Sequence, residues 1–165
     1  PVILYNNPGK THVNLTLPTV VQLADIENIV GIKDTSGSLA LTADYITETP
    51  DDFAVLVGSD PLIFAGLCHG ADGAIASTGN IVPAVVAGIY DAYRAGDTAR
   101  ALDLQQRLVP LRRIVDRATF PVVLKEGLRA AGIEAGWCFA PARDLGDADR
   151  AELAEVVADL LADKQ

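Results

Sequence analysis

Short apolar runs alternate with helical patterns through the first 95 residues, and this alternation constrains the fold more than any other feature. The four apolar runs are Val2–Tyr5, Ile29–Ile32, Phe53–Val57 and Gly73–Ala76. The helical patterns that follow them cover residues 18–26, 38–47, 61–68 and 82–95. Such alternation predicts βα units with a parallel sheet, and so an α/β fold. The runs are apolar throughout, which is typical of strands covered on both faces.

Beyond residue 96 the sequence predicts helices alone. Apolar side chains spaced by three and four form one stripe, which comprises Ala101, Leu104, Leu108, Leu111 and Val115. Pro110 inside this stripe predicts a break in the helix. Two more helices are expected, one over 122–131 and one after Asp147 with the apolar positions Leu153, Val156, Val157, Leu160 and Leu161. We therefore expect an α/β part over 1–96 and a helical part over 97–165.

Composition excludes several classes of protein. Half of the 165 residues are hydrophobic, which a disordered chain cannot match. Two cysteines are too few for a disulfide scaffold and fit a reducing cytoplasm. A net charge of −9 argues against nucleic acid as a partner, and neither a targeting signal nor an apolar membrane helix is visible. The chain has no methionine and begins at Pro1 in a predicted strand, which indicates either processing or a missing first part.

Polar residues follow each apolar run, and ligands bind at the carboxyl ends of parallel strands. Lys33 comes directly after Ile32 and should be partly buried. Burial disfavours the charged form of an amine, and a neutral amine attacks a ketone to form a Schiff base. The alternative is that Lys33 pairs with Asp34 or another carboxylate at the sheet edge. Tyr5 can relay protons, although a tyrosine with an exposed hydroxyl is ordinary at a strand end.

No metal site is expected. Cys68 and His69 are adjacent, so their side chains diverge, and no partner pair has the spacing of metal ligands. Gly58 and Gly73 permit a close approach of the backbone or serve only as turn residues. No complete phosphate-binding glycine motif is present.

Several segments together resemble the dihydrodipicolinate synthase/N-acetylneuraminate lyase family. The run from Tyr5 to Thr11 is similar to its Y-N-x-P-x-R-T signature, and Val30–Gly37 is similar to its Schiff-base strand, G-x-K-(D/E)-x-(S/T)-G. Gly58-Ser59-Asp60 and Gly70–Ser77 are similar to the next two strand ends, with Asn80 and Pro83 in the pattern. Pro121–Lys125 resembles a later P-x-x-x-K segment. The order and spacing of these segments extend the resemblance over essentially the whole chain.

The resemblance implies a class I, pyruvate-dependent lyase or synthase that needs no cofactor beyond a covalent imine with its substrate. Lys33 would form the imine and Tyr5 would shuttle the proton. The backbone near Ile75 would line the pyruvate site, with Gly58 beside it. Asp60 and Ser77 match positions that contact the second substrate, an aldehyde. Lys10 stands where the synthase branch has an arginine, and lysine lacks the bidentate fork of arginine.

The resemblance also implies a (β/α)₈ barrel, of which this chain would supply strands five to eight and the C-terminal helical region. Four strands cannot close such a barrel, and two apolar sheet edges would be exposed. A homo-oligomer, a dimer or tetramer, is expected. For the aldehyde, dihydrodipicolinate-type synthesis competes with aldolase activity on 2-keto-3-deoxy sugar acids, 4-hydroxy-2-oxoglutarate or N-acetylneuraminate. A non-catalytic binding or regulatory relative and an unrelated doubly wound domain remain as alternatives.

Overall fold

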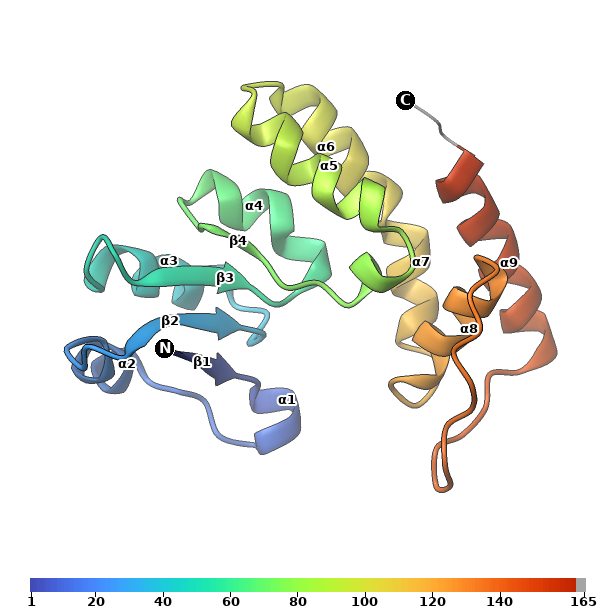
Figure 1. The fold of residues 1–165 in the computed structure, drawn as a ribbon, viewed down its shortest axis with the longest axis horizontal. Helices are drawn as coiled ribbons and strands as arrows, with labels where there is room; N and C mark the ends of the chain where they lie inside the picture. Colours follow the sequence, from blue (N-terminus) through green and yellow to red (C-terminus); the bar gives the residue numbers. More distant parts are fainter. Residues whose placement is uncertain (163–165) are drawn as a thin grey trace. The chain divides into compact units, whose positions relative to one another are not determined.

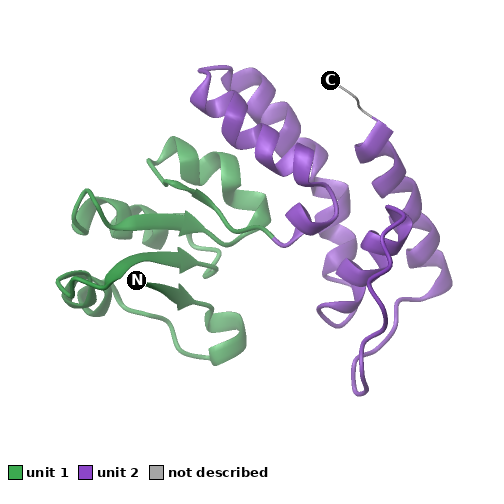
Figure 2. Ribbon diagram, viewed as in Figure 1, with its two compact units in different colours: residues 1–76 green, residues 77–165 purple. Residues whose placement is uncertain are grey.

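The computed structural model describes residues 1–162 and divides the chain into two compact units, which Figure 2 colours separately. Unit 1 comprises Pro1–Ala76, and unit 2 begins at Ser77. The division falls before the boundary expected near residue 96. The boundary near residue 96 separates the strand–helix repeats from the helices that follow, whereas the two compact units are defined by how densely their residues contact one another. The boundary near residue 96 therefore stays a prediction.

Unit 1 is built around a parallel sheet (Figure 1). Its strands are β1 (Val2–Asn6), β2 (Ile29–Asp34), β3 (Ala54–Val57) and β4 (Gly73–Ala74). They lie in the order β1-β2-β3-β4, and each neighbouring pair is parallel. The α/β class with a parallel sheet is therefore confirmed. Each predicted apolar run holds a strand, although β4 is shorter than its run.

Helices follow the strands of unit 1, and all of them except the short first one cover one face of the sheet. They are α1 (Pro8–Thr11), α2 (Leu17–Ala24), α3 (Leu39–Glu48) and α4 (Ile63–Cys68), with a 3₁₀ turn η1 (Asp60–Leu62) before α4. Their core contains Val20, Ile32, Tyr45, Phe53 and Val55, each at most 5% exposed. The α3 helix begins as expected, because the Ser38 hydroxyl accepts a hydrogen bond from Leu41 N at 3.2 Å. The short α1 was not predicted.

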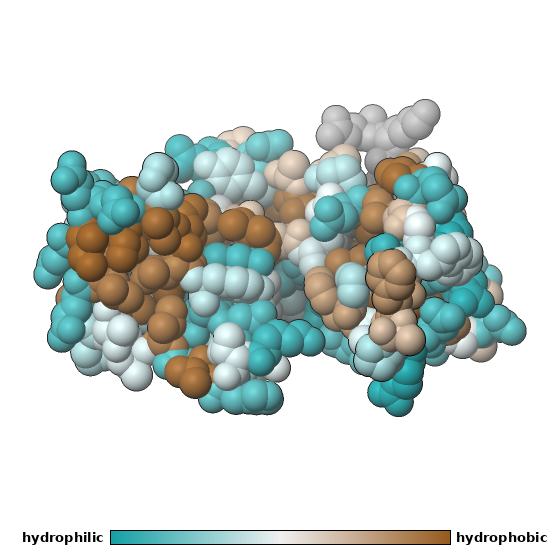
Figure 3. Space-filling view, turned by 60° about the horizontal axis from the view of Figure 1, so that its bottom comes forward, coloured by the Kyte–Doolittle hydropathy of each residue, from teal (hydrophilic) through white to brown (hydrophobic). Residues whose placement is uncertain are grey.

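The other face of the sheet is exposed. Side chains alternate along a strand, so Ile3 and Tyr5 point away from the helix-covered face, and they are 46% and 52% exposed. Ile75, directly after β4, is 45% exposed. Figure 3 shows hydrophobic surface gathered over the left part of the molecule, which is unit 1 in Figure 2. Within residues 1–162 no segment covers this face of β1, and the expected covering of the strands on both faces stays a prediction.

Unit 2 is helical. It contains the 3₁₀ turn η2 (Thr78–Asn80) and the helices α5 (Pro83–Arg94), α6 (Thr98–Arg107), α7 (Val109–Val115), α8 (Val122–Ala130) and α9 (Asp147–Ala162). The predicted stripe from Ala101 to Val115 is buried throughout. The break predicted from Pro110 is also present, because α6 and α7 meet at Leu108. In α9, however, Leu161 is 43% exposed and does not join the buried face.

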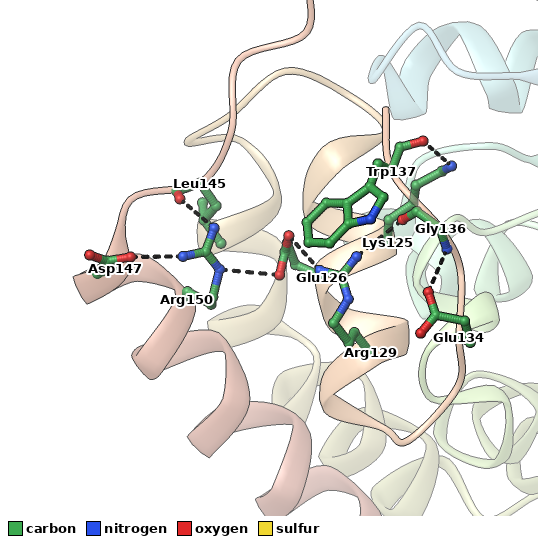
Figure 4. Close-up of polar contacts among 9 residues, drawn as sticks. All are labelled: Lys125, Glu126, Arg129, Glu134, Gly136, Trp137, Leu145, Asp147 and Arg150. Atoms are coloured by element: carbon green, nitrogen blue, oxygen red, sulfur yellow. Dashed lines mark hydrogen bonds and ion pairs between the residues drawn. The ribbon is translucent and has the colours of Figure 1, made fainter. Parts of the chain in front are cut away.

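A buried carboxylate joins α8 to α9 (Figure 4). Glu126, which is 6% exposed, pairs with Arg129 at 2.7 Å and with Arg150 of α9 at 3.2 Å. Burial raises the pKa of Glu126, but the hydrogen bonds and charges of the two arginines outweigh burial and lower it. Arg129 also stacks over the Trp137 ring, 4.1 Å from its centroid, and so holds the segment between α8 and α9. Within residues 1–162 no helix combines the length and the hydrophobicity needed to cross a membrane.

Candidate active site

Tyr5 and Lys33 meet at the carboxyl ends of β1 and β2. The two residues are directly opposite each other in the register of the strands. The Lys33 Nζ lies 4.3 Å from the centroid of the Tyr5 ring. Lys33 is half-buried, as expected, and both side chains lie on the sheet face that helices α2 and α3 leave open. The structure therefore brings the two predicted catalytic residues together.

The Tyr5 phenol has an environment that favours its deprotonated form. Burial raises the pKa of this phenol, but Thr35, Lys33 and Asn7 together lower it below its ordinary value. Asn7 Nδ2 donates a hydrogen bond to the phenol oxygen at 2.9 Å. The Thr35 hydroxyl is buried and has no hydrogen bond of ordinary geometry with a described residue. A phenol with a lowered pKa beside an amine is suited to move protons.

Gly58 leaves the space that the Lys33 side chain occupies. A Cβ built at Gly58, directly after β3, would lie 2.0 Å from Thr35 Oγ1 and 2.9 Å from Lys33 Cε. The Gly58 N–H donates to Asp34 O at 2.7 Å, which holds the ends of β3 and β2 close. The absence of a side chain at Gly58 is therefore a geometric requirement of the Lys33 position.

The remaining predicted site residues are distributed over both units. Ile75 N donates to Val57 O at 2.9 Å, and the register of β3 with β4 places Ile75 on the same sheet face as Lys33. Asp60 is 3% exposed at the start of η1, after β3. Lys10 is exposed on α1. Ser77 belongs to unit 2, so its part in a site with Lys33 stays a prediction.

Several buried polar residues lie behind this site, and the sequence analysis named only Asp34 among them, as a possible partner of Lys33. Asn6, Asp34 and Thr42 are at most 4% exposed, and the Tyr45 ring is fully buried. Asn6 follows Tyr5 and Asp34 follows Lys33, so strand alternation turns their side chains toward the helices. The sequence did offer one hint, because a polar residue directly follows each of the two catalytic candidates. Burial of those residues requires the packed structure.

The chemistry available at the site is that of an amine and a phenol on an open sheet face. An amine adds to a carbonyl and loses water to give an imine. Among the described residues no group of three His, Cys, Asp or Glu side chains could hold a metal ion. At this edge of the sheet, Lys33 and Tyr5 are the two protonable groups that face each other.

Comparison with known proteins identifies the same family throughout. A sequence profile of the dihydrodipicolinate synthetase family matches residues 1–160. A 4-hydroxy-tetrahydrodipicolinate synthase of Archaeoglobus fulgidus is 36% identical over 97% of this chain and 55% of its own length. A 4-hydroxy-tetrahydrodipicolinate synthase of Methanoculleus marisnigri is 38% identical over 95% of this chain and 54% of its own length.

Solved structures agree with the sequence matches. Dihydrodipicolinate synthase DapA-2 of Bacillus anthracis superposes with a TM-score of 0.90 at 34% identity, over 95% of this chain and 54% of that one. YagE of Escherichia coli K12, a prophage protein of the dihydrodipicolinic acid synthase family solved with pyruvate, superposes with a TM-score of 0.89 at 34% identity, over 98% of this chain and 56% of that one. The chain therefore spans about half the length of the proteins it matches.

Proposed function

The chain belongs to the dihydrodipicolinate synthetase family, and from this premise we propose that it supplies the Schiff-base lysine, Lys33, of a pyruvate-dependent lyase or synthase. Relatives named as synthases support an enzyme of the lyase class. The observation that carries the proposal is the position of Lys33 Nζ, 4.3 Å from the Tyr5 ring centroid on the open sheet face. YagE, a structural relative, was solved with pyruvate, which supports a 2-keto acid as the substrate.

In the proposed reaction the neutral Lys33 amine attacks the keto carbon of pyruvate. The carbonyl oxygen leaves as water, and a protonated imine joins Nζ to the former keto carbon. The imine withdraws electrons, so a methyl proton leaves and an enamine forms. The enamine carbon then attacks the carbonyl of an aldehyde, and water releases the product from Lys33. In the opposite direction the same steps cleave an aldol.

Tyr5 is proposed as the group that carries protons to and from the reacting atoms. Its phenol lies beside Lys33, and its lowered pKa makes proton release easier. The backbone near Ile75 and the open space at Gly58 would line the keto-acid site. Asp60 and Ser77 would contact the second substrate.

The aldehyde is proposed to be that of a dihydrodipicolinate-type synthesis, in line with the names of the relatives. Lys10 would hold the carboxylate of this aldehyde with a single charged group rather than a bidentate fork. The alternative is an aldolase for 2-keto-3-deoxy sugar acids, 4-hydroxy-2-oxoglutarate or N-acetylneuraminate. Turnover of the intact protein with pyruvate and aspartate semialdehyde, against cleavage of each sugar acid, distinguishes these substrates.

We also propose that β1–β4 correspond to strands five to eight of a (β/α)₈ barrel, followed by the helical region of unit 2. The superposition on about half of each related structure supports this assignment. The edges of the sheet are β1 and β4, and an open parallel edge favours pairing with further strands. A homo-oligomer in the cytoplasm is the proposed working form.

Reduction by borohydride tests the proposed function. The intact protein is incubated with pyruvate and borohydride, which converts the imine to a stable secondary amine, and its mass is measured. We expect one carboxyethyl group per chain, with none after Lys33→Arg or without pyruvate. Lys125→Arg is the matched control, because Lys125 lies in unit 2 and donates to Trp137 O at 2.8 Å. An unmodified intact protein would favour a non-catalytic relative instead.

A further inference from the structure

Four buried polar residues lie on the helix-covered side of the sheet, directly behind Tyr5 and Lys33. We call Asn6, Asp34, Thr42 and Tyr45 the Asp34 cluster. None of these residues is more than 4% exposed. Burying a carboxylate costs free energy unless hydrogen bonds replace its lost hydration. Asp34 therefore needs hydrogen-bond donors around it.

The Asp34 carboxylate accepts hydrogen bonds from four donors. Asn6 Nδ2 donates to Oδ1 at 2.9 Å, and Ser36 N donates to the same oxygen at 3.0 Å. Ser36 Oγ donates to Oδ2 at 2.9 Å, and Thr42 Oγ1 donates to it at 2.7 Å. An asparagine side chain has one acceptor oxygen, and its NH₂ group would face two donors. The site is therefore built for a carboxylate.

Asn6 connects this carboxylate to β1 and to the loop after α1. Its Nδ2 donates to Asn14 Oδ1 at 2.8 Å as well as to Asp34, and its Oδ1 accepts from Leu15 N at 3.0 Å. Asn6 and Asp34 are opposite each other in the strand register, one position beyond Tyr5 and Lys33. A change in the Asn6–Asp34 pair therefore changes how the neighbouring pair meets on the other face.

Helix α3 holds the cluster from the opposite side. Thr42 donates to Asp34, and the Tyr45 hydroxyl, one turn later, donates to Leu15 O. Burial and the charge of Asp34 raise the pKa of Tyr45 to about 12, so its phenol stays protonated and able to donate. The cluster thus joins the ends of two strands, one loop and one helix through fixed donors and acceptors.

We propose that Asp34 is a positioning residue for the Schiff-base chemistry, acting with Asn6 to fix the strand ends so that Lys33 faces Tyr5. The inference rests on the proposed function. Asp34 points toward the helices and so acts through the backbone of β2, not by contact with substrate. Misplacement of a reacting group by about 1 Å can cost roughly 10²-fold in rate. Loss of the cluster should therefore slow imine formation without changing the groups that bind pyruvate.

The kinetic test uses Asp34→Asn in the intact protein, with Asp44→Asn on the exposed side of α3 as the control. The rate of borohydride trapping is measured against pyruvate concentration. For Asp34→Asn we expect the maximal rate to fall about 10- to 100-fold, with half-saturating pyruvate changed less than about threefold. Asp44→Asn should match the wild type. A raised half-saturating concentration at an unchanged maximal rate would overturn the proposal, because Asp34 would then affect binding.

A spectroscopic test separates this inference from the proposed function. Because Lys33 Nζ lies 4.3 Å from the centroid of the Tyr5 ring, we expect the ring to shift the NMR signals of the Lys33 Cε protons upfield in the wild-type protein. We expect Asp34→Asn to reduce this shift while circular dichroism shows a folded chain. Thr42→Val, which removes one donor and keeps the shape, should cause a smaller reduction and serves if Asp34→Asn fails to fold. Unchanged Cε shifts in both folded variants would refute the positioning role. A wild-type protein with the shift but without an adduct would refute only the proposed function.

Discussion

Gly58→Ala is expected to displace Lys33, the proposed Schiff-base lysine, without unfolding the protein. The new methyl carbon would lie 2.0 Å from Thr35 Oγ1 and 2.9 Å from Lys33 Cε, whereas ordinary contacts begin at 3.4 Å. Both of these neighbours are side-chain atoms that can move. The backbone atom Asp34 O lies 3.0 Å from the methyl carbon and must give only a few tenths of an ångström. The Lys33 arm and the Thr35 hydroxyl therefore take up most of the strain.

Gly58→Ala should lower the rate of imine formation strongly and the free energy of unfolding only moderately. Overpacking costs about 1–3 kcal/mol, and replacing glycine by alanine returns about 0.4–1 kcal/mol by restricting the unfolded chain. The net loss in free energy of unfolding is then at most about 2.5 kcal/mol. Displacing the reacting amine by a sizeable fraction of an ångström should slow borohydride trapping with pyruvate by about 10- to 100-fold.

The assay compares Gly58→Ala with Gly73→Ala. A Cβ at Gly73, in β4, would lie 3.6 Å from Leu56 Cδ2, which is an ordinary contact. Trapping rates and urea unfolding are measured for both variants. Adding Thr35→Ala to Gly58→Ala removes the closest contact and should restore part of the rate. A wild-type trapping rate for Gly58→Ala, or an equal loss in both glycine variants, would show that a side chain at position 58 does not displace Lys33.

Three further changes have defined outcomes. Lys33→Met should raise the pKa of the Tyr5 phenol, because the ammonium that lowers it is removed, and NMR titration of labelled tyrosine with Tyr5→Phe for assignment measures this. Glu126→Gln should reduce the free energy of unfolding by about 1–3 kcal/mol at neutral pH. The difference in free energy of unfolding between the two proteins should shrink in acid. The pKa of Glu126 is lowered in the folded state, so the stability that its carboxylate contributes is lost as the pH falls through the folded-state pKa. Urea unfolding at neutral and at acidic pH checks this. Ser38→Ala should cost about 1 kcal/mol by removing the cap of α3, measured by thermal unfolding.

The sequence predicts the parallel sheet of unit 1 because its signals are local. Apolar runs mark the strands, and Pro18 and Ser38 mark the starts of helices, so each element is visible within about ten residues. Lys33 and Tyr5 are predicted as site residues for the same reason, since each stands at the end of an apolar run. The two residues meet because the register of β1 with β2 pairs Tyr5 with Lys33, and this register cannot be read from the sequence alone.

The Asp34 cluster is not predicted because its meaning depends on distant contacts. Asn6 and Thr42 are ordinary polar residues in the sequence, and only packing of α3 against the strand ends buries them around one carboxylate. Ile3 has the sequence pattern of a core residue, and within residues 1–162 no segment covers it. Leu161 belongs to the apolar pattern of α9, but it lies about 100° around the helix from the buried Leu160 and so points to a different side.

Mapping the reduced adduct by peptide mass spectrometry shows which lysine forms the imine with pyruvate. The intact protein is treated with pyruvate and borohydride, digested, and each lysine peptide is sequenced by fragmentation. We predict a carboxyethyl group on Lys33 alone, with Lys10 and Lys125 unmodified at the same pyruvate concentration. A modification spread over all lysines, or confined to a lysine other than Lys33, would contradict the assignment of Lys33 as the Schiff-base residue.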